Sequence, residues 1–424
     1  MTTDAQGHVR RTIDAVWRIE STRLIAALAR MVRDVGLAEE LAQDAFLAAL
    51  EHWTSDGVPD KPGAWLMATA KRRAIDRLRQ HQLHARKQAQ IDLDDDWMPV
   101  LADADPETAA DEVIPDDVLR LVFTACHPVL SVDAQVALTL RLLGGLTTEE
   151  IARACLVPEA TVAQRIVRAK RTLADAQVPF ETPGRDELPE RLAAVLGVVY
   201  LIFNEGYAAT SGNEWMRPAL SEEALRLGRI LAALAPQEAD VHGLVALMEL
   251  QASRFGARTT ADGTPILLLD QDRGRWDRVY IQHGLAALQR AERLGGADGP
   301  YALQAAIAAC HARATTAAET DWPRIAALYA RLAQRMPSPV VELNRAVAVS
   351  MAFGAQAGLD VVDTLVDAPA LRDYHLLPSV RGDLLAKLGR HGEARREFER
   401  AASLATNARE ASLLRRRAAD SPVG

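Results

Sequence analysis

Cysteine is scarce in this chain, with three among 424 residues: Cys126, Cys155 and Cys310. Three thiols cannot build a disulfide framework. The Cys126-His127 and Cys310-His311 pairs also lack the ligand spacing of a structural zinc site. The chain has no P-loop, dinucleotide-binding fingerprint or nucleophile elbow. We therefore expect no metal, no cofactor and no enzymatic activity.

Aromatic residues and long apolar runs are also few. Aromatics make up 5% of the chain, and the longest apolar run, Leu192 to Phe203, has 12 residues. A helix needs about 20 apolar residues to span a bilayer. The first residues contain no apolar signal core. We therefore expect a cytoplasmic protein without a membrane segment. Its richness in Leu, Ala, Arg and Glu predicts an all-α fold.

Charge of each sign is confined to particular stretches. Residues 1–90 carry 14 basic and 11 acidic residues, residues 91–117 carry 11 acidic and no basic residues, and residues 118–177 carry 7 basic and 5 acidic residues. The acidic stretch also contains prolines, which predicts an extended linker. It is either a solvated spacer or a nucleic-acid mimic that lies in a basic channel of a partner. Basic clusters at 71–87 and 161–173 favour targeted contact with nucleic acid.

The first ninety residues contain three helical patterns, at 9–35, 37–53 and 63–87. We expect Gly36 to break the chain between the first two helices. Residues 54–60 are rich in turn formers and predict a loop. The second helix has a mainly acidic face, which is either solvated or a docking surface for a basic helix. Trp65, beside the basic cluster, is either a core residue or a platform on which a base stacks.

Two segments of this region carry a family resemblance. Residues 34–51 read DVGLAEELAQDAFLAALE and residues 64–79 read AWLMATAKRRAIDRLR. They resemble region 2 of bacterial extracytoplasmic-function sigma factors. The resemblance implies that residues 1–90 dock on the β′ clamp helices of core RNA polymerase through Glu40, Gln43, Asp44 and Leu47. It further implies that the minus-ten promoter element is melted and held by Trp53, Asp56, Trp65, Lys71, Arg72, Arg73, Arg77 and Arg79.

Residues 118–177 contain a helix-turn-helix pattern. Short helices are predicted at 147–154 and 159–173, and Thr147 and Glu150 have the spacing of a capping box. In the second helix Gln164 and Arg165 suit base edges, while Arg168 and Arg171 suit phosphates. The block resembles region 4 of the same family, which reads the minus-thirty-five element and contacts the polymerase β flap. The resemblance adds Glu159, Thr161 and Ala163 to the expected DNA contacts.

Residues 185–424 make up more than half of the chain and predict successive helices with short connections. Gly382, Ala394 and Phe398 have the small and large spacing of a tetratricopeptide unit, so we expect an α-solenoid of helical hairpins. This matches the extension of a subgroup of the same sigma factors. Two polar segments, 204–217 and 269–277, are either ordinary loops or a site for a partner, a ligand or the chain's own DNA-binding domains.

These features together predict an alternative sigma factor whose C-terminal domain controls its activity in cis, through contact with the DNA-binding regions. The competing hypothesis is a helix-turn-helix regulator with a helical-repeat domain that never engages polymerase. A third, an enzyme with a ligand-binding solenoid, has no motif in its favour.

Overall fold

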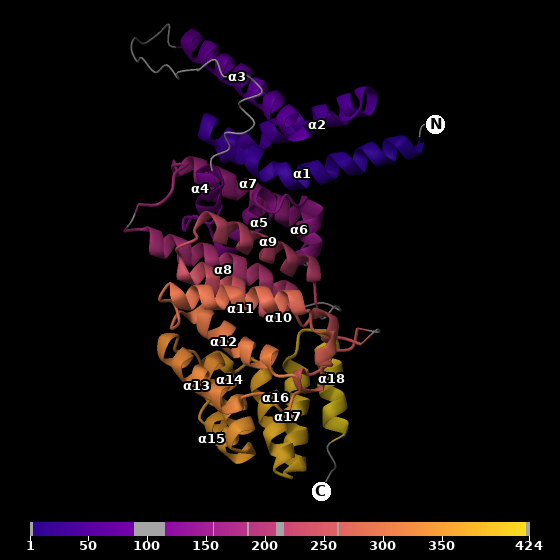
Figure 1. Cartoon of the computed structure of the whole chain (residues 1–424), viewed down its shortest axis with the longest axis vertical. Helices are drawn as coiled ribbons and strands as arrows, with labels where there is room; N and C mark the ends of the chain where they lie inside the picture. The colour runs from indigo at the N-terminus through magenta and orange to yellow at the C-terminus, as the bar shows by residue number, and fades with distance from the viewer. Residues whose placement is uncertain are drawn as a thin grey trace. The chain divides into compact units, whose positions relative to one another are not determined.

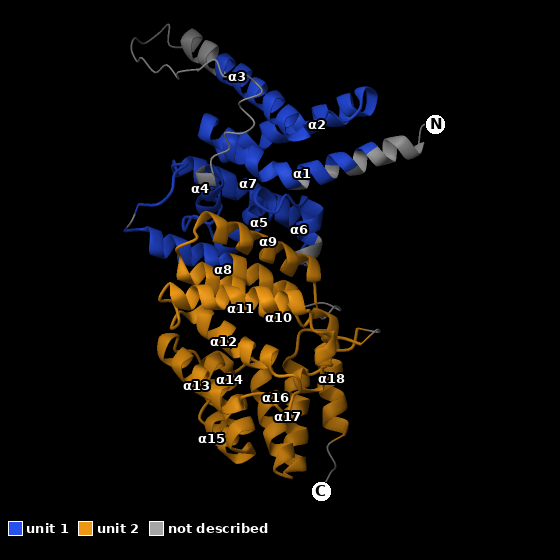
Figure 2. Ribbon diagram, viewed as in Figure 1, with its two compact units in different colours: residues 1–198 blue, residues 199–424 orange. Residues whose placement is uncertain are grey.

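A computed structural model describes residues 3–88, 115–155, 157–184, 186–208, 216–260 and 263–420. Within these ranges the chain is helical, with a single isolated β-bridge between Thr259 and Pro265 (Figure 1). The all-α prediction is therefore confirmed. No helix in the described ranges is both long and apolar enough to cross a membrane. The chain divides into two compact units, residues 1–198 and 199–424 (Figure 2).

The first unit begins with a three-helix bundle: α1 (Thr3–Val32), α2 (Val35–Asp56) and α3 (Pro62–Gln88). Each of the three helices packs against the other two. Their shared core contains Leu24, Leu28, Leu41 and Leu66, all at most 4% exposed. In α1 and α2 the apolar rows that predicted the helices meet in the core, whereas α3 buries Leu66, Met67, Ala70 and Ala74.

The break between α1 and α2 lies two residues before the position we predicted. Arg33 takes a left-handed conformation (φ 54°), and the side chain of Asp34 caps α2 by accepting a hydrogen bond from the Leu37 amide at 2.9 Å. Gly36 lies inside the first turn of α2. Aspartate is a better N-cap for α2 than glycine, because its carboxylate accepts a hydrogen bond from a free amide of the first turn.

The same unit contains four further helices: α4 (Pro115–Ala125), α5 (Val132–Leu142), α6 (Thr148–Cys155) and α7 (Glu159–Asp175). The predicted capping box is present at α6. The Glu150 carboxylate accepts from the Thr147 amide at 2.8 Å, and the Thr147 hydroxyl accepts from the Glu150 amide at 3.1 Å. The inner row of α7, Val162, Ile166, Ala169 and Leu173, is buried.

The acidic linker lies largely outside the described residues, which resume at Pro115. Its last three residues belong to α4, so helical structure begins earlier than the linker prediction allowed. Asp117 is fully buried and contacts Arg120 at 2.9 Å and Arg30 at 3.3 Å. A buried carboxylate with two basic partners is part of a packed domain, not of a solvated spacer.

The second unit is a succession of helices after α8 (Leu188–Tyr207), whose first half belongs to the first unit, so the division falls later than residue 185. Many of these helices begin where local chemistry predicts: proline occupies the first turn of several, and Asp277, Asp321 and Asn407 cap others. The helices are α9 (Pro218–Leu234), α10 (Ala239–Ala252), α11 (Arg278–Arg293), α12 (Pro300–Arg313), α13 (Trp322–Arg335), α14 (Pro339–Phe353), α15 (Ala355–Asp363), α16 (Leu376–Lys387), α17 (His391–Leu404) and α18 (Ala408–Ala419).

Within the second unit most helices pack chiefly on their neighbours in sequence, as Figure 1 shows for α13 to α18, whereas α12 packs chiefly on α10. Gly382 on α16 lies against α17: a Cβ added there would come within 3.0 Å of the Phe398 ring. The small and large residues singled out in the sequence therefore do meet across one helical hairpin. The last helix, α18, has a strongly charged sequence and packs on α17.

Candidate polymerase and nucleic-acid interfaces

The acidic face of α2 is exposed and contains an apolar residue at its centre. Glu40 and Asp44 are exposed, and Leu47 is 55% exposed although Leu41, on the same helix, is 4% exposed. An exposed leucine between two exposed carboxylates offers both apolar area and negative charge to a protein partner. Gln43 is half-buried and donates to the Glu39 carboxylate at 2.6 Å, so it is already engaged inside the bundle.

Two tryptophans connect α2 with α3. Trp53 is 2% exposed and packs edge-on against the half-buried Trp65, with ring centroids 5.4 Å apart. This burial contradicts our expectation that Trp53 contacts DNA, because a residue in the core has no face to offer a base. Trp53 instead packs against the Trp65 ring inside the bundle. Asp56, at the end of α2, is exposed and accepts from the Ser55 hydroxyl at 2.9 Å.

The basic residues of α3 fall into two groups. Arg72, Arg77 and Arg79 are exposed, whereas Lys71 and Arg73 are half-buried. Arg73 donates to the Asp44 carbonyl at 2.8 Å, and its guanidinium lies 3.7 Å from the Asp44 carboxylate. A residue expected at DNA thus contacts a residue expected at polymerase, which places the two surfaces side by side on one bundle.

The outer face of α7 is available to a partner. Glu159, Ala163, Gln164, Arg168 and Arg171 are exposed, and Thr161 is partly exposed. Arg165 is partly covered and forms an ion pair with Asp133 of α5 at 2.7 Å. Because the inner row of α7 is buried, this helix has one packed face and one polar face, as a recognition helix in the major groove requires.

Comparisons with known proteins match the two helical regions that contain these surfaces. Sigma-70 region 2 matches residues 18–84, and sigma-70 region 4 matches residues 120–173. The ECF RNA polymerase sigma factor SigK of Mycobacterium ulcerans (strain Agy99) is 30% identical over 156 residues, which are 36% of this chain and 78% of SigK. This chain belongs to the ECF RNA polymerase sigma factors. A probable member, SigI of Mycobacterium tuberculosis (strain ATCC 25618 / H37Rv), is 27% identical over 39% of this chain and 56% of SigI.

The part of this sigma factor beyond region 4 has relatives of its own. A family of unknown function (DUF6596) matches residues 191–292. An uncharacterized protein of Rhizobium meliloti (strain 1021) is 45% identical over 394 residues, covering 92% of this chain and 91% of the relative. The extension is therefore shared with a protein of nearly the same architecture. It is not an irregular addition to a sigma factor.

The sigma factor's segment 269–277, one of the two polar segments left open above, is a structural connector. Arg273 is 5% exposed and donates to the Ala314 carbonyl at 3.0 Å and the Thr320 hydroxyl at 2.9 Å, next to the end of α12. Burial lowers the pKa of Arg273, and neighbouring Arg254 lowers it further. Residues 209–215 of the other segment lie outside the described ranges.

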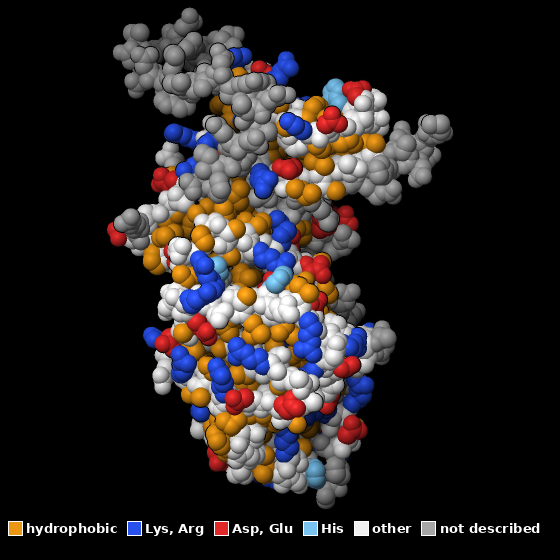
Figure 3. Space-filling view, in the orientation of Figure 1, with side chains coloured by type: hydrophobic (Ala, Val, Ile, Leu, Met, Phe, Trp, Pro, Cys, Tyr) orange, Lys and Arg blue, Asp and Glu red, His pale blue; other side chains and the backbone are white. Residues whose placement is uncertain are grey.

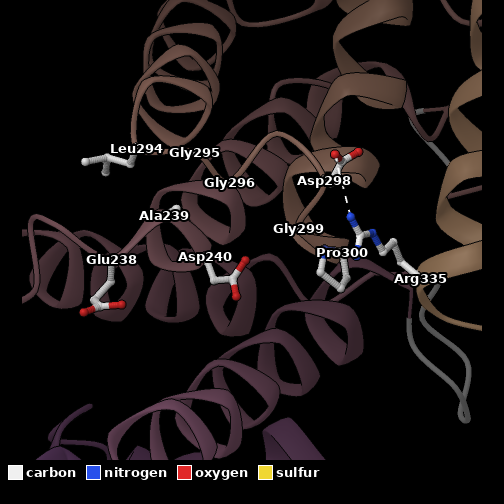
Figure 4. Close-up of a pocket in the computed structure, with 10 residues that line it drawn as sticks. All are labelled: Glu238, Ala239, Asp240, Leu294, Gly295, Gly296, Asp298, Gly299, Pro300 and Arg335. Carbon is white, nitrogen blue, oxygen red and sulfur yellow. Dashed lines mark ion pairs between the residues drawn. The ribbon is translucent and has the colours of Figure 1, made fainter. Parts of the chain in front are cut away.

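The second unit of the sigma factor also has a surface pocket of about 520 Å³ (Figure 4). Glu238 and Asp240 lie at the start of α10, and Asp298 forms ion pairs with Arg331 and, at 3.8 Å, with Arg335.

In the described ranges no group of three or more His, Cys, Asp or Glu residues is arranged to hold a metal ion. Over the face of the second unit seen in Figure 3, basic and acidic side chains are interspersed and form no continuous basic patch.

Sequence reasoning missed one set of contacts. Glu39, beside the predicted docking residue Glu40, is 2% exposed and contacts Arg141 of α5 and Lys170 of α7. The only hint in the sequence was its position in the inward row of α2. Nothing local marks the two basic partners, which lie about a hundred or more residues away.

Proposed function

We propose that this alternative sigma factor binds core RNA polymerase through the exposed α2 face of Glu40, Asp44 and Leu47, on the β′ clamp helices. Leu47 offers apolar surface that a partner can bury, and the carboxylates of Glu40 and Asp44 attract basic residues of a partner. Both features support this assignment. Region 4 then reaches the polymerase β flap. The observation that carries the proposal is an exposed acidic and apolar face on the same three-helix bundle as a basic helix.

Promoter DNA is held at two places. The minus-ten strand lies along α3 against Arg72, Arg77 and Arg79, with Lys71 beside them, and a base stacks on Trp65. The minus-thirty-five duplex receives the outer face of α7, where Gln164 reads a base edge and Arg168 and Arg171 contact phosphates. Glu159, Thr161, Ala163 and Arg165 complete that surface. Polymerase performs the chemistry, and the sigma factor acts in the cytoplasm, where polymerase and promoter DNA meet.

The proposed domain organisation is region 2 at residues 1–90, a linker that ends before α4, region 4 from Pro115 to residue 177, and a tetratricopeptide-like domain in residues 199–424 that controls activity in cis. The helical hairpin at Gly382 and Phe398 supports the last assignment. Helical repeats of this kind build extended binding surfaces. We expect the control to act through contact with the DNA-binding regions.

Run-off transcription with purified core polymerase tests the proposal. The template carries the promoter that lies upstream of the genes around the protein's own gene. The intact chain is compared with residues 1–207, which keep α8 whole. Transcript from either form supports the sigma function, and the ratio of the two gives the direction of control. Duplex binding without polymerase binding or transcript would instead identify a regulator that does not engage polymerase.

A further inference from the structure

The connector between α10 and α11 carries two arginines that lie against one tryptophan. The guanidinium carbon of Arg273 is 5.0 Å from the centre of the Trp276 ring, and that of Arg254 is 5.5 Å from it. The two positive charges are therefore within about 11 Å of each other, close to the Debye length at 0.1 M salt. The Asp277 amide donates to the Ser253 carbonyl at 2.8 Å, which closes the connector at its base and fixes this arrangement locally.

Both arginines have neutral hydrogen-bond partners. Arg254 donates to the amide oxygens of Gln271 at 3.2 Å and Gln251 at 3.3 Å. Arg273 donates to backbone carbonyls at the end of α12 and to the Thr320 hydroxyl. None of the ion pairs within the described part of the chain involves either arginine.

Nearby carboxylates do not neutralise this charge. Asp272 and Asp277 accept from backbone amides of the connector and of the first turn of α11. Burial lowers the pKa of Arg273, Arg254 lowers it further, and the exposed Glu319 opposes them only in part. The two guanidiniums therefore keep positive charge that is costly to hold away from water without a negative partner.

Three buried nitrogen atoms at the same place have no hydrogen-bond partner among the described residues. They are Arg273 Nε, Trp276 Nε1 and His311 Nδ1, in residues that are 5%, 3% and 8% exposed. Arg273 connects them, because its guanidinium lies against the Trp276 ring and donates to the His311 carbonyl. Most buried side-chain polar atoms in proteins have a partner. The guanidinium and indole nitrogens can only donate, so the group that satisfies them is an acceptor.

His311 experiences the positive potential of the two arginines. Burial, together with the charges of Arg254 and Arg273, lowers the pKa of His311 to about 3. Its imidazole is therefore neutral at pH 7, and its Nδ1 atom donates in the tautomer that carries the proton there. The ring packs edge-on against Trp322, with ring centroids 5.2 Å apart. The place thus combines two positive charges with up to three available N–H donors.

We propose that Arg254, Arg273, Trp276 and His311, which we call the Arg273 cluster, bind the phosphate group of a small ligand. A phosphate group carries close to two negative charges near neutral pH and offers several acceptor oxygens, which suits two guanidiniums and further N–H donors. A carboxylate carries one charge and two oxygens, so it matches the cluster less well. Arg254 is partly exposed, and the ligand enters on its side. This inference goes beyond the proposed sigma function and does not rest on it.

Equilibrium dialysis of the full chain against radiolabelled inorganic phosphate tests the site, with the ionic strength held constant by chloride. The basic helices α3 and α7 can also bind phosphate weakly, so the comparison is made between variants. Arg254→Gln removes one of the two charges and should weaken binding at the site by roughly tenfold or more. Arg275→Gln is the matched control, because Arg275 lies on the same connector and is exposed. Its phosphate binding should equal that of the parent.

A conservative variant and hydrogen exchange separate binding from damage to the fold. Arg254→Lys keeps the charge without the planar fork and should bind phosphate with an affinity between those of the parent and Arg254→Gln. Phosphate should slow hydrogen exchange in residues 253–277 and 311–320 of the parent and of Arg275→Gln. Equal phosphate binding by the parent and Arg254→Gln, or none by either, would overturn the proposal. Protection confined to α3 and α7 would overturn it as well.

Competition with unlabelled anions identifies the class of ligand. Glycerol 3-phosphate should displace the labelled phosphate about as well as inorganic phosphate does, because the rest of the molecule can extend past the partly exposed Arg254. Displacement by inorganic phosphate alone would assign the site to the free ion. Acetate should compete at least roughly tenfold more weakly, because it carries a single charge. Acetate that competes as well as phosphate would overturn the assignment to a doubly charged group.

Discussion

Leu47 offers the sharpest test of the polymerase interface, because its apolar area is exposed in the free protein. Changing Leu47 to Ala removes three carbons, and full burial of these is worth roughly 2.4 kcal/mol at about 0.8 kcal/mol per carbon. Since 55% of Leu47 is exposed, docking gains at most that share, about 1.3 kcal/mol. We therefore expect Leu47→Ala to weaken core polymerase binding by up to roughly ninefold.

Leu41→Ala is the matched control on the same helix. Leu41 is 4% exposed, so the same truncation leaves a cavity in the bundle and costs about 2–5 kcal/mol of stability. Leu47→Ala should leave the thermal unfolding midpoint nearly unchanged, because its side chain contributes little to the folded core. We thus expect Leu47→Ala to lose polymerase affinity but not stability, and Leu41→Ala to lose stability.

Binding of fluorescently labelled core polymerase, measured by titration at constant salt, gives the affinities, and calorimetry gives the unfolding midpoints. Two results would refute the reasoning. Leu47→Ala binding polymerase as tightly as the parent would remove α2 as the docking face. A marked drop in its unfolding midpoint would show that the exposed leucine is structural after all.

Three further predictions concern the fold. Thr147→Ala removes one half of the capping box and should cost about 0.5–2 kcal/mol, seen as faster hydrogen exchange in α6; unchanged exchange would argue that the cap contributes nothing. Gly382→Val should destabilise the second unit by about 1–3 kcal/mol in urea unfolding, because a Cβ there meets the Phe398 ring, whereas Gly392→Ala, with open space around it, should not. Burial lowers the pKa of His311 from 6.5 to about 3. Between these values only the unfolded chain takes up the proton, so stability should fall as pH drops below 6.5, by up to about 2 kcal/mol at pH 5. In His311→Gln that slope should disappear between pH 7.5 and pH 5, and an equal slope in both proteins would assign it elsewhere.

Helix positions followed closely from local sequence. The helices of the structure coincide with the apolar rows at helical spacing. Several begin at a proline, and α6 begins at the Thr147–Glu150 capping box. Family motifs identified regions 2 and 4 for the same reason: both are contiguous stretches whose chemistry is carried by one or two helices. Gly36 was misjudged because a glycine tolerates a helix interior, while the adjacent Asp34 provides the cap that starts α2.

Side-chain environments could not be predicted in the same way. In the sequence, Trp53 and Trp65 look equally suited to contact DNA, because both are aromatic and close to the basic cluster. Only the packing of the bundle buries Trp53 and leaves Trp65 partly exposed. Asp117 looked like the end of a solvated acidic stretch, and only the fold supplies Arg30 and Arg120 as its partners.

The sequence alone determined that this protein is an all-helical ECF sigma factor with a helical extension, because periodicity, caps and motifs are local properties of the chain. The tertiary structure decided which charges are buried and which surfaces remain free. Glu39 and Arg141 are 102 residues apart, and their contact depends on how two domains pack. No pattern in either segment encodes that packing, so the contact between Glu39 and Arg141 became visible only in three dimensions.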